Sequence, residues 1–385
     1  MSGRRLLYFV TEDWYFWSHR LAIARAARDS GYEVTVATAV NEHGGRIAAE
    51  GFELAPLSLS RRSVNPIKET AGVGEIVSVY RRVRPHIVHH VALKPVIYGS
   101  IAAAVADVPV TVNALAGLGH VFVAKGLKAA LTRGAIKTAL GMAMRRGKSC
   151  SIFQNPDDMR AFVEAGIVEQ SHAELIMGSG VDTGIFEPPQ AEPAGTPVIL
   201  LSSRMLSTKG VFDFVEAARI LKSRGVSVRM ALAGSPDPHN PSSIPLAQLA
   251  AWNDEGVVEY WGMRENMPET LRETAIVALP SFYGEGVPKS LIEAASSARP
   301  VIAYDIPGCR EIVRDGVNGY LAPLRDVAAL AGRMETLLAD SGLRGKMGAA
   351  GREMVINGFS EKTVIEKTLA LYSRRLKEAG LQGRV

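Results

Sequence analysis

Short runs of apolar, often β-branched residues alternate with longer helical patterns along this chain of 385 residues. The runs are apolar at successive positions, so they predict strands that are buried on both faces of a sheet. Between them, residues 19–30, 211–224 and 289–298 show the apolar spacing of three and four that indicates a helix. This alternation is typical of parallel sheets with helices on both sides. Strands are expected at 6–10, 33–38, 86–91, 108–113, 151–154 and 174–177, and again at 198–203, 228–233, 257–261, 276–280 and 301–304.

A proline-rich segment, residues 186–195, separates these two sets of strands. The length suits two domains better than one. We therefore expect two doubly wound α/β domains, residues 1–185 and 186–360, that face each other across a cleft. In open α/β sheets, ligands bind at the carboxyl ends of the strands, which would line that cleft.

Several classes of protein are excluded by composition. Two cysteines are too few for a disulfide scaffold, and with eight histidines they make a Cys/His zinc cluster improbable. The apolar run at the N-terminus ends after five residues, at Thr11, so it is too short for a signal peptide. The longest weakly charged stretch, 96–124, contains Asp107 and Pro109 and does not suit a spanning helix. The expectation is a cytoplasmic protein.

The charge is distributed unevenly. Residues 1–156 hold 20 Lys and Arg against 10 Asp and Glu, a net charge of +10, whereas residues 157–385 carry −5. No acid occurs between 108 and 156. An excess of this kind points to a membrane surface, a phosphate-bearing substrate or nucleic acid as partner. Nucleic acid is disfavoured, because no recognisable binding module accompanies the basic stretch.

Part of that stretch resembles a basic amphipathic segment that could lie on anionic lipid. A solvated basic helix is the alternative interpretation. The basic residues proposed to meet the membrane are Lys125, Lys128, Arg133 and Lys137.

Two acids stand near a predicted helix start in the second domain. Glu285 lies in a glycine-containing loop after a strand, and Glu293 lies in the helix that begins near Pro288. The free N–H groups of that helix could bind an anion. A carboxylate in the helix can accept the hydroxyls of a ribose, and one in the loop can meet a sugar ring. The pair is equally consistent with acids stabilised by the helix dipole.

A second loop carries two cations. Arg204 and Lys209 follow the strand expected at 198–203, and Gly210 precedes a helix. An arginine fork and a lysine ammonium at a strand's carboxyl end can converge on a diphosphate and neutralise the charge of a departing nucleotide. Either cation alone could also be a solvated loop residue.

Together, Arg204, Lys209-Gly210 and the Glu285/Glu293 pair resemble the donor site of the retaining glycosyltransferases of family 4. The resemblance extends over nearly the whole chain, and it implies the GT-B fold of two Rossmann-like domains. It also implies a C-terminal helix, about 361–380, that packs back on the first domain. Three N-terminal segments, 60–66, 89–95 and 113–119, look more specifically like bacterial enzymes that extend saccharides on undecaprenyl diphosphate.

The resemblance implies a UDP-sugar donor and a polyprenyl-diphosphate-linked acceptor. Arg204, Lys209 and Glu285 would be catalytic, with Glu285 contacting the transferred sugar and Glu293 the ribose. The donor-binding residues would be Arg204, Lys209, Gly286, Val287, Pro288 and Glu293. On the acceptor side, Asn113 stands where many relatives carry a histidine, and His120 is a possible substitute.

No cofactor is implied, and no Asp-x-Asp motif for a donor-bound metal is present. The expected location is the inner face of a bacterial plasma membrane, as a peripheral protein. Two alternatives remain open from the sequence. One is a GT-B enzyme such as a UDP-N-acetylglucosamine 2-epimerase, and the other is a non-catalytic, two-lobed protein that binds a nucleotide or a small anion.

Overall fold

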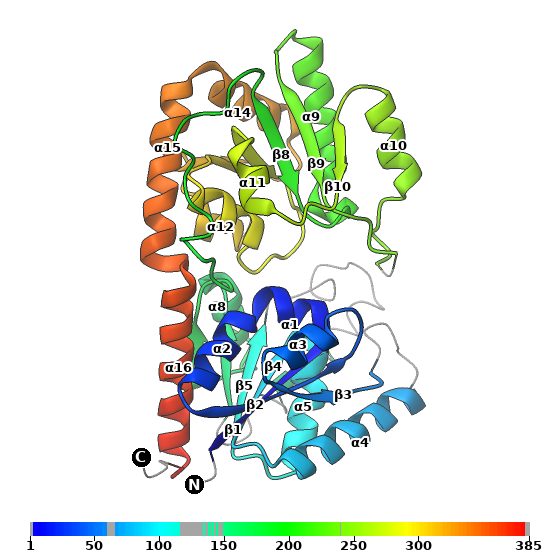
Figure 1. The fold of residues 1–385 in the computed structure, drawn as a ribbon, viewed down its shortest axis with the longest axis vertical. Helices are drawn as coiled ribbons and strands as arrows, with labels where there is room; N and C mark the ends of the chain where they lie inside the picture. Colours follow the sequence, from blue (N-terminus) through cyan, green and yellow to red (C-terminus); the bar gives the residue numbers. More distant parts are fainter. Residues whose placement is uncertain are drawn as a thin grey trace. The chain divides into compact units, whose positions relative to one another are not determined.

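The computed structural model describes residues 3–59, 66–115, 134, 138, 140–141, 144, 149–238 and 240–381. The chain divides into two compact units (Figure 1). The first unit is Met1–Ser179 together with Glu361–Val385, and the second is Gly180–Ser360. Each contains one parallel sheet with helices on both sides, so the α/β fold class is confirmed. The division after Ser179 lies six residues before the boundary expected at 185/186.

Among its described residues, the first unit has a seven-stranded sheet in the order β3-β2-β1-β4-β5-β6-β7, with parallel pairing throughout. Its strands are β1 (Arg4–Glu12), β2 (Tyr32–Ala39), β3 (Glu53–Pro56), β4 (Ile87–Val91), β5 (Val110–Leu115), β6 (Ser149–Phe153) and β7 (Ala173–Leu175). Its helices are α1 (Asp13–His19), α2 (Leu21–Asp29), α3 (Gly44–Ala49), α4 (Pro66–Val83), α5 (Leu93–Val105), α8 (Pro156–Glu164), the 3-10 turn η1 (Gln170–His172) and α16 (Glu361–Glu378).

The interior strand β1 shows why this sheet is covered on both faces. Its side chains alternate between two cores, with Leu6 and Tyr8 in one and Leu7 and Phe9 in the other. The first core also takes in side chains of α2 and α16, and the second takes in side chains of α4 and α5. The C-terminal helix α16 is therefore part of the first unit's core, although it comes last in the chain.

The second unit has a six-stranded parallel sheet in the order β10-β9-β8-β11-β12-β13. Its strands are β8 (Val198–Ser202), β9 (Arg229–Ala233), β10 (Glu259–Gly262), β11 (Ile276–Leu279), β12 (Val301–Tyr304) and β13 (Gly319–Ala322). Its helices are η2 (Ser207–Lys209), α9 (Val211–Ser223), α10 (Leu246–Asp254), α11 (Met267–Arg272), α12 (Lys289–Ser296), α13 (Cys309–Ile312), α14 (Val327–Ala339), α15 (Ser341–Met354) and the π-helical turn η3 (Val355–Phe359).

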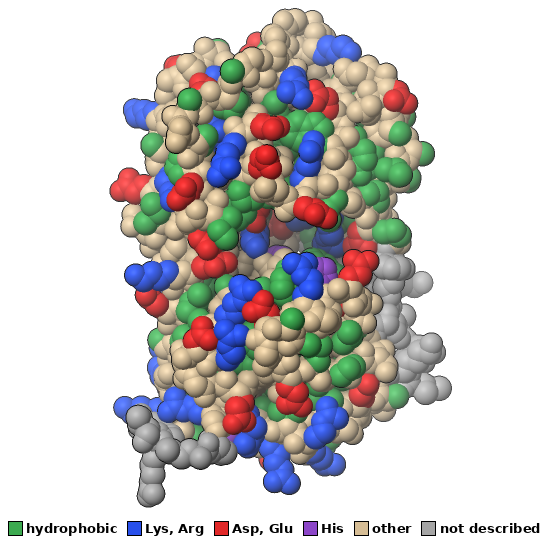
Figure 2. Space-filling view, viewed as in Figure 1, with side chains coloured by type: hydrophobic (Ala, Val, Ile, Leu, Met, Phe, Trp, Pro, Cys, Tyr) green, Lys and Arg blue, Asp and Glu red, His purple; other side chains and the backbone are tan. Residues whose placement is uncertain are grey.

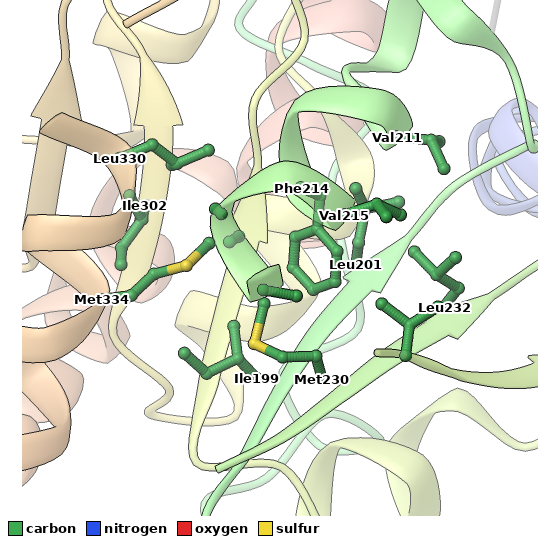
Figure 3. Packing of buried hydrophobic residues seen from close by; sticks show 14 of the residues in the cluster. Ile199, Leu201, Val211, Phe214, Val215, Met230, Leu232, Ile302, Leu330 and Met334 are labelled. Carbon is green, nitrogen blue, oxygen red and sulfur yellow. The ribbon is translucent and has the colours of Figure 1, made fainter. Parts of the chain in front are cut away.

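Helix α9 covers one face of this sheet. Its Phe214 and Val215 pack over Leu201 of β8 and Leu232 of β9 in a core of fully or nearly fully buried side chains (Figure 3). Met334 of α14 extends the same core toward β12. Burial of this kind stabilises a domain by about 1.5–3 kcal/mol for each large apolar side chain.

The surface of the second unit carries charge of both signs. On the face seen in Figure 2, acidic and basic side chains are interspersed over this unit. The exposed ion pairs of this unit include Arg224 with Glu335 at 2.7 Å and Arg229 with Glu259 at 2.7 Å. Such pairs are worth about 0–1 kcal/mol each, so they say little about stability or function.

Two strands were not expected from the sequence. β3 has four residues and ends in Pro56, and β13 has four residues and begins with Gly319. Proline and glycine are depleted in strands, so neither segment shows a strand pattern. Gly319 is required by packing, because a Cβ there would lie 1.8 Å from the carbonyl oxygen of Val301 on β12.

Candidate active site

The second unit's sheet has one point where the strand order reverses. β8 lies next to β11, with β9 and β10 on one side and β12 and β13 on the other. The loops 203–210 and 280–288 follow β8 and β11, so they leave the sheet side by side at its carboxyl edge. In doubly wound folds this is the position where ligands bind.

Contacts near Gly210 join these two loops. Gly210 has φ of +77°, and a Cβ on it would lie 1.9 Å from the carbonyl oxygen of Pro280. The backbone N–H of Phe282 donates to the carbonyl oxygen of Thr208 at 3.2 Å. Only glycine permits both the left-handed backbone and this close approach. The Lys-Gly pair noted in the sequence therefore fixes the position of one loop on the other.

The ammonium of Lys209 meets the carboxylate of Glu285 across these loops. Their Nζ and Oε1 atoms are 2.5 Å apart, and the two side chains are 21% and 13% exposed. The hydroxyl of Ser281 donates to the same Oε1 at 2.7 Å. The structure thus brings together two residues that are 76 positions apart in the sequence and were predicted to serve one site.

Arg204 has a carboxylate partner from a third loop. Its Nη1 lies 2.6 Å from Oδ2 of Asp237, which follows β9. The loops after β8 and β9 are in close contact, because a Cβ at Gly234 would lie 1.8 Å from the carbonyl oxygen of Ser203.

Sequence reasoning missed Asp237 and Ser281 as members of this constellation. Each follows a strand of one parallel sheet within a few residues. Polar side chains at that position share the carboxyl edge of the sheet, and this was the signal that could have found them.

Glu293 lies in α12, where its side chain is 14% exposed. Loss of solvent on burial raises the pKa of its carboxyl group, and the ammonium of Lys289, 3.8 Å away and one turn earlier, opposes that shift. Helix α12 follows Pro288, whose φ of −63° suits the start of a helix.

Residues 286–288 connect Glu285 to that helix. Val287 is 6% exposed, and Gly286 contributes a carbonyl oxygen that packs against Gly308. A Cβ at Gly308, which has φ of +82°, would lie 1.6 Å from that oxygen. The loop that carries Glu285 is therefore packed against the loop after β12 as well as the loop after β8.

In the first unit, Asn113 belongs to a buried polar network. Its Oδ1 accepts hydrogen bonds from Nδ1–H of His90 at 2.8 Å and from the hydroxyl of Ser100 at 3.3 Å. Nε2 of His90 accepts from the hydroxyl of Tyr80 at 2.9 Å. Burial lowers the pKa of His90 to about 4, so the ring is neutral at pH 7. Among the described residues, Nδ2 of Asn113 has no hydrogen-bond partner.

The other predicted acceptor and membrane residues are outside the described part of the chain. They are His120, Lys125, Lys128, Arg133 and Lys137. Most of segment 60–66 and residues 116–119 of segment 113–119 are outside it as well.

No helix among the described residues is both long and apolar enough to cross a membrane. Within the same part of the chain, no group of three or more His, Cys, Asp or Glu side chains is placed to hold a metal ion.

Both halves of the chain match sequence models of glycosyltransferases. Residues 196–340 match the family described as glycosyl transferases group 1, and residues 5–145 match the glycosyl transferase 4-like family. Among curated proteins, the chain is similar to the N,N'-diacetylbacillosaminyl-diphospho-undecaprenol alpha-1,3-N-acetylgalactosaminyltransferase of Campylobacter jejuni. The two are 26% identical over 93% of this chain and 95% of that protein.

Solved structures show the same fold. A glycosyltransferase from Rickettsia africae superimposes with a TM-score of 0.79 at 18% identity, over 98% of this chain and 100% of that one. HepE from Anabaena, solved in complex with UDP and glucose, gives a TM-score of 0.75 at 17% identity, over 97% and 100%. The matches favour a transferase over the epimerase and over the non-catalytic binding protein. The chain belongs to the family 4 glycosyltransferases, enzymes with the GT-B fold.

Proposed function

We propose that this enzyme transfers a hexose or an N-acetylhexosamine from a UDP-sugar to a saccharide linked to polyprenyl diphosphate, with retention at the anomeric carbon. The reaction would extend a glycan or a cell-surface polysaccharide. The observation that carries the donor half of this proposal is the Lys209–Glu285–Ser281 arrangement at the sheet's reversal point. It joins a cation suited to a diphosphate with a carboxylate suited to sugar hydroxyls.

The donor would lie along the carboxyl edge of the second unit's sheet. Arg204 and Lys209 would bind the diphosphate, and Glu293 would accept hydrogen bonds from the ribose. Residues 286–288 would lie against the donor between these groups. Support for uridine comes from HepE, whose structure was solved with UDP and glucose.

The chemistry breaks the bond between the anomeric carbon and the diphosphate oxygen, and its electron pair leaves on UDP. A new bond forms to an acceptor hydroxyl oxygen, whose proton passes to the departing diphosphate. Negative charge therefore grows on the diphosphate, where Arg204 and Lys209 would stabilise it without a metal ion. Glu285 would hold the transferred sugar so that its anomeric carbon faces the acceptor.

The first unit would bind the acceptor and the membrane. Its positive charge suits a lipid diphosphate and an anionic bilayer. The similarity to the C. jejuni enzyme, whose name specifies an undecaprenyl-diphosphate-linked acceptor, supports this assignment. Asn113 and His120 are proposed on the acceptor side, with Lys125, Lys128, Arg133 and Lys137 toward the lipid. The enzyme would then be peripheral on the inner face of a bacterial plasma membrane.

A panel of nucleotide-sugars tests the proposal. Each donor is incubated with the enzyme and a polyprenyl-diphosphate-linked saccharide, and the mass of the product is measured by mass spectrometry. A mass gain of one hexose or one N-acetylhexosamine, from a UDP-sugar only, is the expected result. The anomeric coupling constant in the product's NMR spectrum then reports retention. Transfer to the free saccharide at the same rate as to the lipid-linked one would contradict the acceptor assignment.

A further inference from the structure

The ammonium that is proposed to bind the donor diphosphate already has a carboxylate partner. Lys209 Nζ lies 2.5 Å from Glu285 Oε1, in a site where both side chains are mostly shielded from solvent. We propose that Glu285 competes with the diphosphate for Lys209 and thereby weakens the binding of the nucleoside diphosphate left after transfer. This inference rests on the proposed function and gives Glu285 a role in product release.

The carboxylate is the better fixed member of the pair. Ser281, which is fully buried, donates to Oε1 at 2.7 Å, and its hydroxyl also lies 3.2 Å from the carbonyl oxygen of Thr208. Lys209 reaches Glu285 through a flexible four-carbon chain. When an anion arrives, the ammonium can therefore move while the carboxylate stays in place.

Geometry makes the two anions compete. A lysine ammonium has a single nitrogen, so two oxygens bonded to it lie only about 4.5 Å apart. At that distance a phosphate oxygen and the Glu285 carboxylate repel each other, and the partial burial of the site keeps the repulsion strong.

Arg204 does not face the same conflict. Its guanidinium has five N–H donors in a planar fork, and Nη1 is the nitrogen that meets Asp237. A planar fork can bond two anions on different edges, whereas a single ammonium nitrogen holds both close together. The competition is thus a property of the Lys209–Glu285 pair.

The intact donor and the product differ in what they offer Glu285. Hydroxyls of the transferred sugar can donate to the carboxylate and replace the bond that Lys209 withdraws. After transfer the sugar is gone, and Glu285 again bonds Lys209 and Ser281 as it does in this structure. The carboxylate therefore favours departure of the nucleoside diphosphate once the reaction is complete.

UDP binding to the full-length chain, measured by titration calorimetry, tests this inference. Glu285→Gln removes the charge and keeps the shape, so UDP should bind on the order of tenfold more tightly than to the wild type. Glu285→Asp keeps the charge and should give no tightening. Glu335→Gln is the matched control, because it neutralises a carboxylate that is paired with Arg224 elsewhere in the same unit. It should leave UDP affinity unchanged.

A double-mutant cycle tests whether Lys209 is the cause of the tighter UDP binding. In a Lys209→Met background, Glu285→Gln should change UDP affinity by less than about twofold, since the contested cation is gone. Equal tightening in both backgrounds would mean that Glu285 repels the diphosphate without any part played by Lys209. That result would overturn competition for Lys209. Unchanged UDP affinity in a folded Glu285→Gln variant would overturn the inference as well. Glu285→Ala repeats the test if the amide variant does not fold.

UDP binding to the wild type separates failure of the competition from failure of the donor site. If the wild type binds UDP through Lys209 but Glu285→Gln gives no tightening, only the competition is wrong. If the wild type binds no UDP, GDP or ADP at millimolar concentration, the proposed donor site itself is wrong, and the inference falls with it.

Discussion

The side chain of Ser281 would be unremarkable in a sequence, yet it holds the carboxylate around which the proposed donor site is built. It is fully buried and donates to Glu285 at 2.7 Å. A buried hydroxyl that bonds a charged acceptor contributes more than one that bonds a neutral group. Removal of the Ser281 hydroxyl should therefore change the position of Glu285 more than it changes the stability of the fold.

We expect Ser281→Ala to lower kcat by roughly tenfold while UDP affinity changes little, because Glu285 loses a hydrogen bond but keeps its charge beside Lys209. Steady-state kinetics measures kcat, and calorimetry on the same preparation measures UDP affinity. Ser297→Ala is the control, since Ser297 is equally buried and its Oγ has no hydrogen-bond partner among the described residues. A Ser281→Ala enzyme with normal kcat would remove Ser281 from the site.

His90 makes a second prediction at this scale. Burial lowers its pKa to about 4 in the folded chain, against an ordinary value of 6.5. Above pH 6.5 the ring is neutral in both states and adds no pH dependence. Between pH 6.5 and 4 the unfolded chain binds a proton that the folded chain does not, so acidification destabilises the fold by up to roughly 3 kcal/mol.

The ring resonances of His90 should accordingly show no titration above about pH 5 in NMR spectra of the folded protein. Urea unfolding between pH 7.5 and 4.5 measures the accompanying decrease in the free energy of unfolding. An imidazole that titrates near pH 6.5 would show that the network with Asn113 and Tyr80 is open to water.

Loops between strands and helices build the site, and glycines set how closely these loops approach. Gly308 allows the loop after β12 to meet the carbonyl oxygen of Gly286, and Gly210 does the same against Pro280. The sequence shows these glycines but not their partners, which come from elements far away in the chain. This is why spacing alone predicted the loops but not the contacts between them.

Gly308→Ala should lower the free energy of unfolding by about 2–4 kcal/mol, because its Cβ would overlap a backbone oxygen at a residue with φ of +82°. Thermal unfolding measures the effect. Gly332→Ala, in the middle of α14 with no atom within 4 Å of its Cβ, should be neutral or slightly stabilising. Similar losses in both variants would contradict the packing argument.

Helix α16 packs in the core of the first unit. Its Tyr372 hydroxyl lies 3.1 Å from that of Tyr8 and 2.5 Å from Nδ1 of His89, and all three side chains are buried. Removing this hydroxyl leaves two buried polar groups short of a partner. Tyr372→Phe should therefore destabilise the first unit by about 1–3 kcal/mol, seen as a lower unfolding midpoint. Tyr15→Phe, on half-buried α1, is the comparison and should cost less.

At the scale of the whole molecule, charge is divided between the two parts of the chain, with +10 in residues 1–156 and −5 in residues 157–385. The cations of the proposed donor site, Arg204 and Lys209, stand in the negative part and are each paired with a carboxylate. The positive excess is therefore available for a different anion, which we propose is the lipid-linked acceptor and the bilayer.

Reversal of Lys125, Lys128, Arg133 and Lys137 to Glu should weaken binding to vesicles that contain anionic phospholipid, with a smaller effect on neutral vesicles. Each basic residue near an anionic surface is worth about 1 kcal/mol, so the loss should exceed tenfold. Vesicle co-sedimentation at low and high salt measures it. Unchanged binding would exclude this segment as the membrane contact.

The sequence by itself determined the α/β class and the two sets of parallel strands, because burial on both faces leaves a local pattern. Loop chemistry also pointed to the residues of the proposed donor site. The sequence did not show β3 or β13, because proline and glycine are depleted in strands. The contact of Gly319 with β12, which requires glycine there, is visible only in the fold. Only the tertiary structure decided that Lys209 meets Glu285 and that Ser281 donates to the same carboxylate. It likewise decided that Asp237 pairs with Arg204 and that Tyr372 contacts Tyr8. Strand pairing brings Lys209 to Glu285 over 76 positions and Arg204 to Asp237 over 33, and packing of α16 brings Tyr372 to Tyr8 over 364. No local pattern encodes which strands and helices become neighbours.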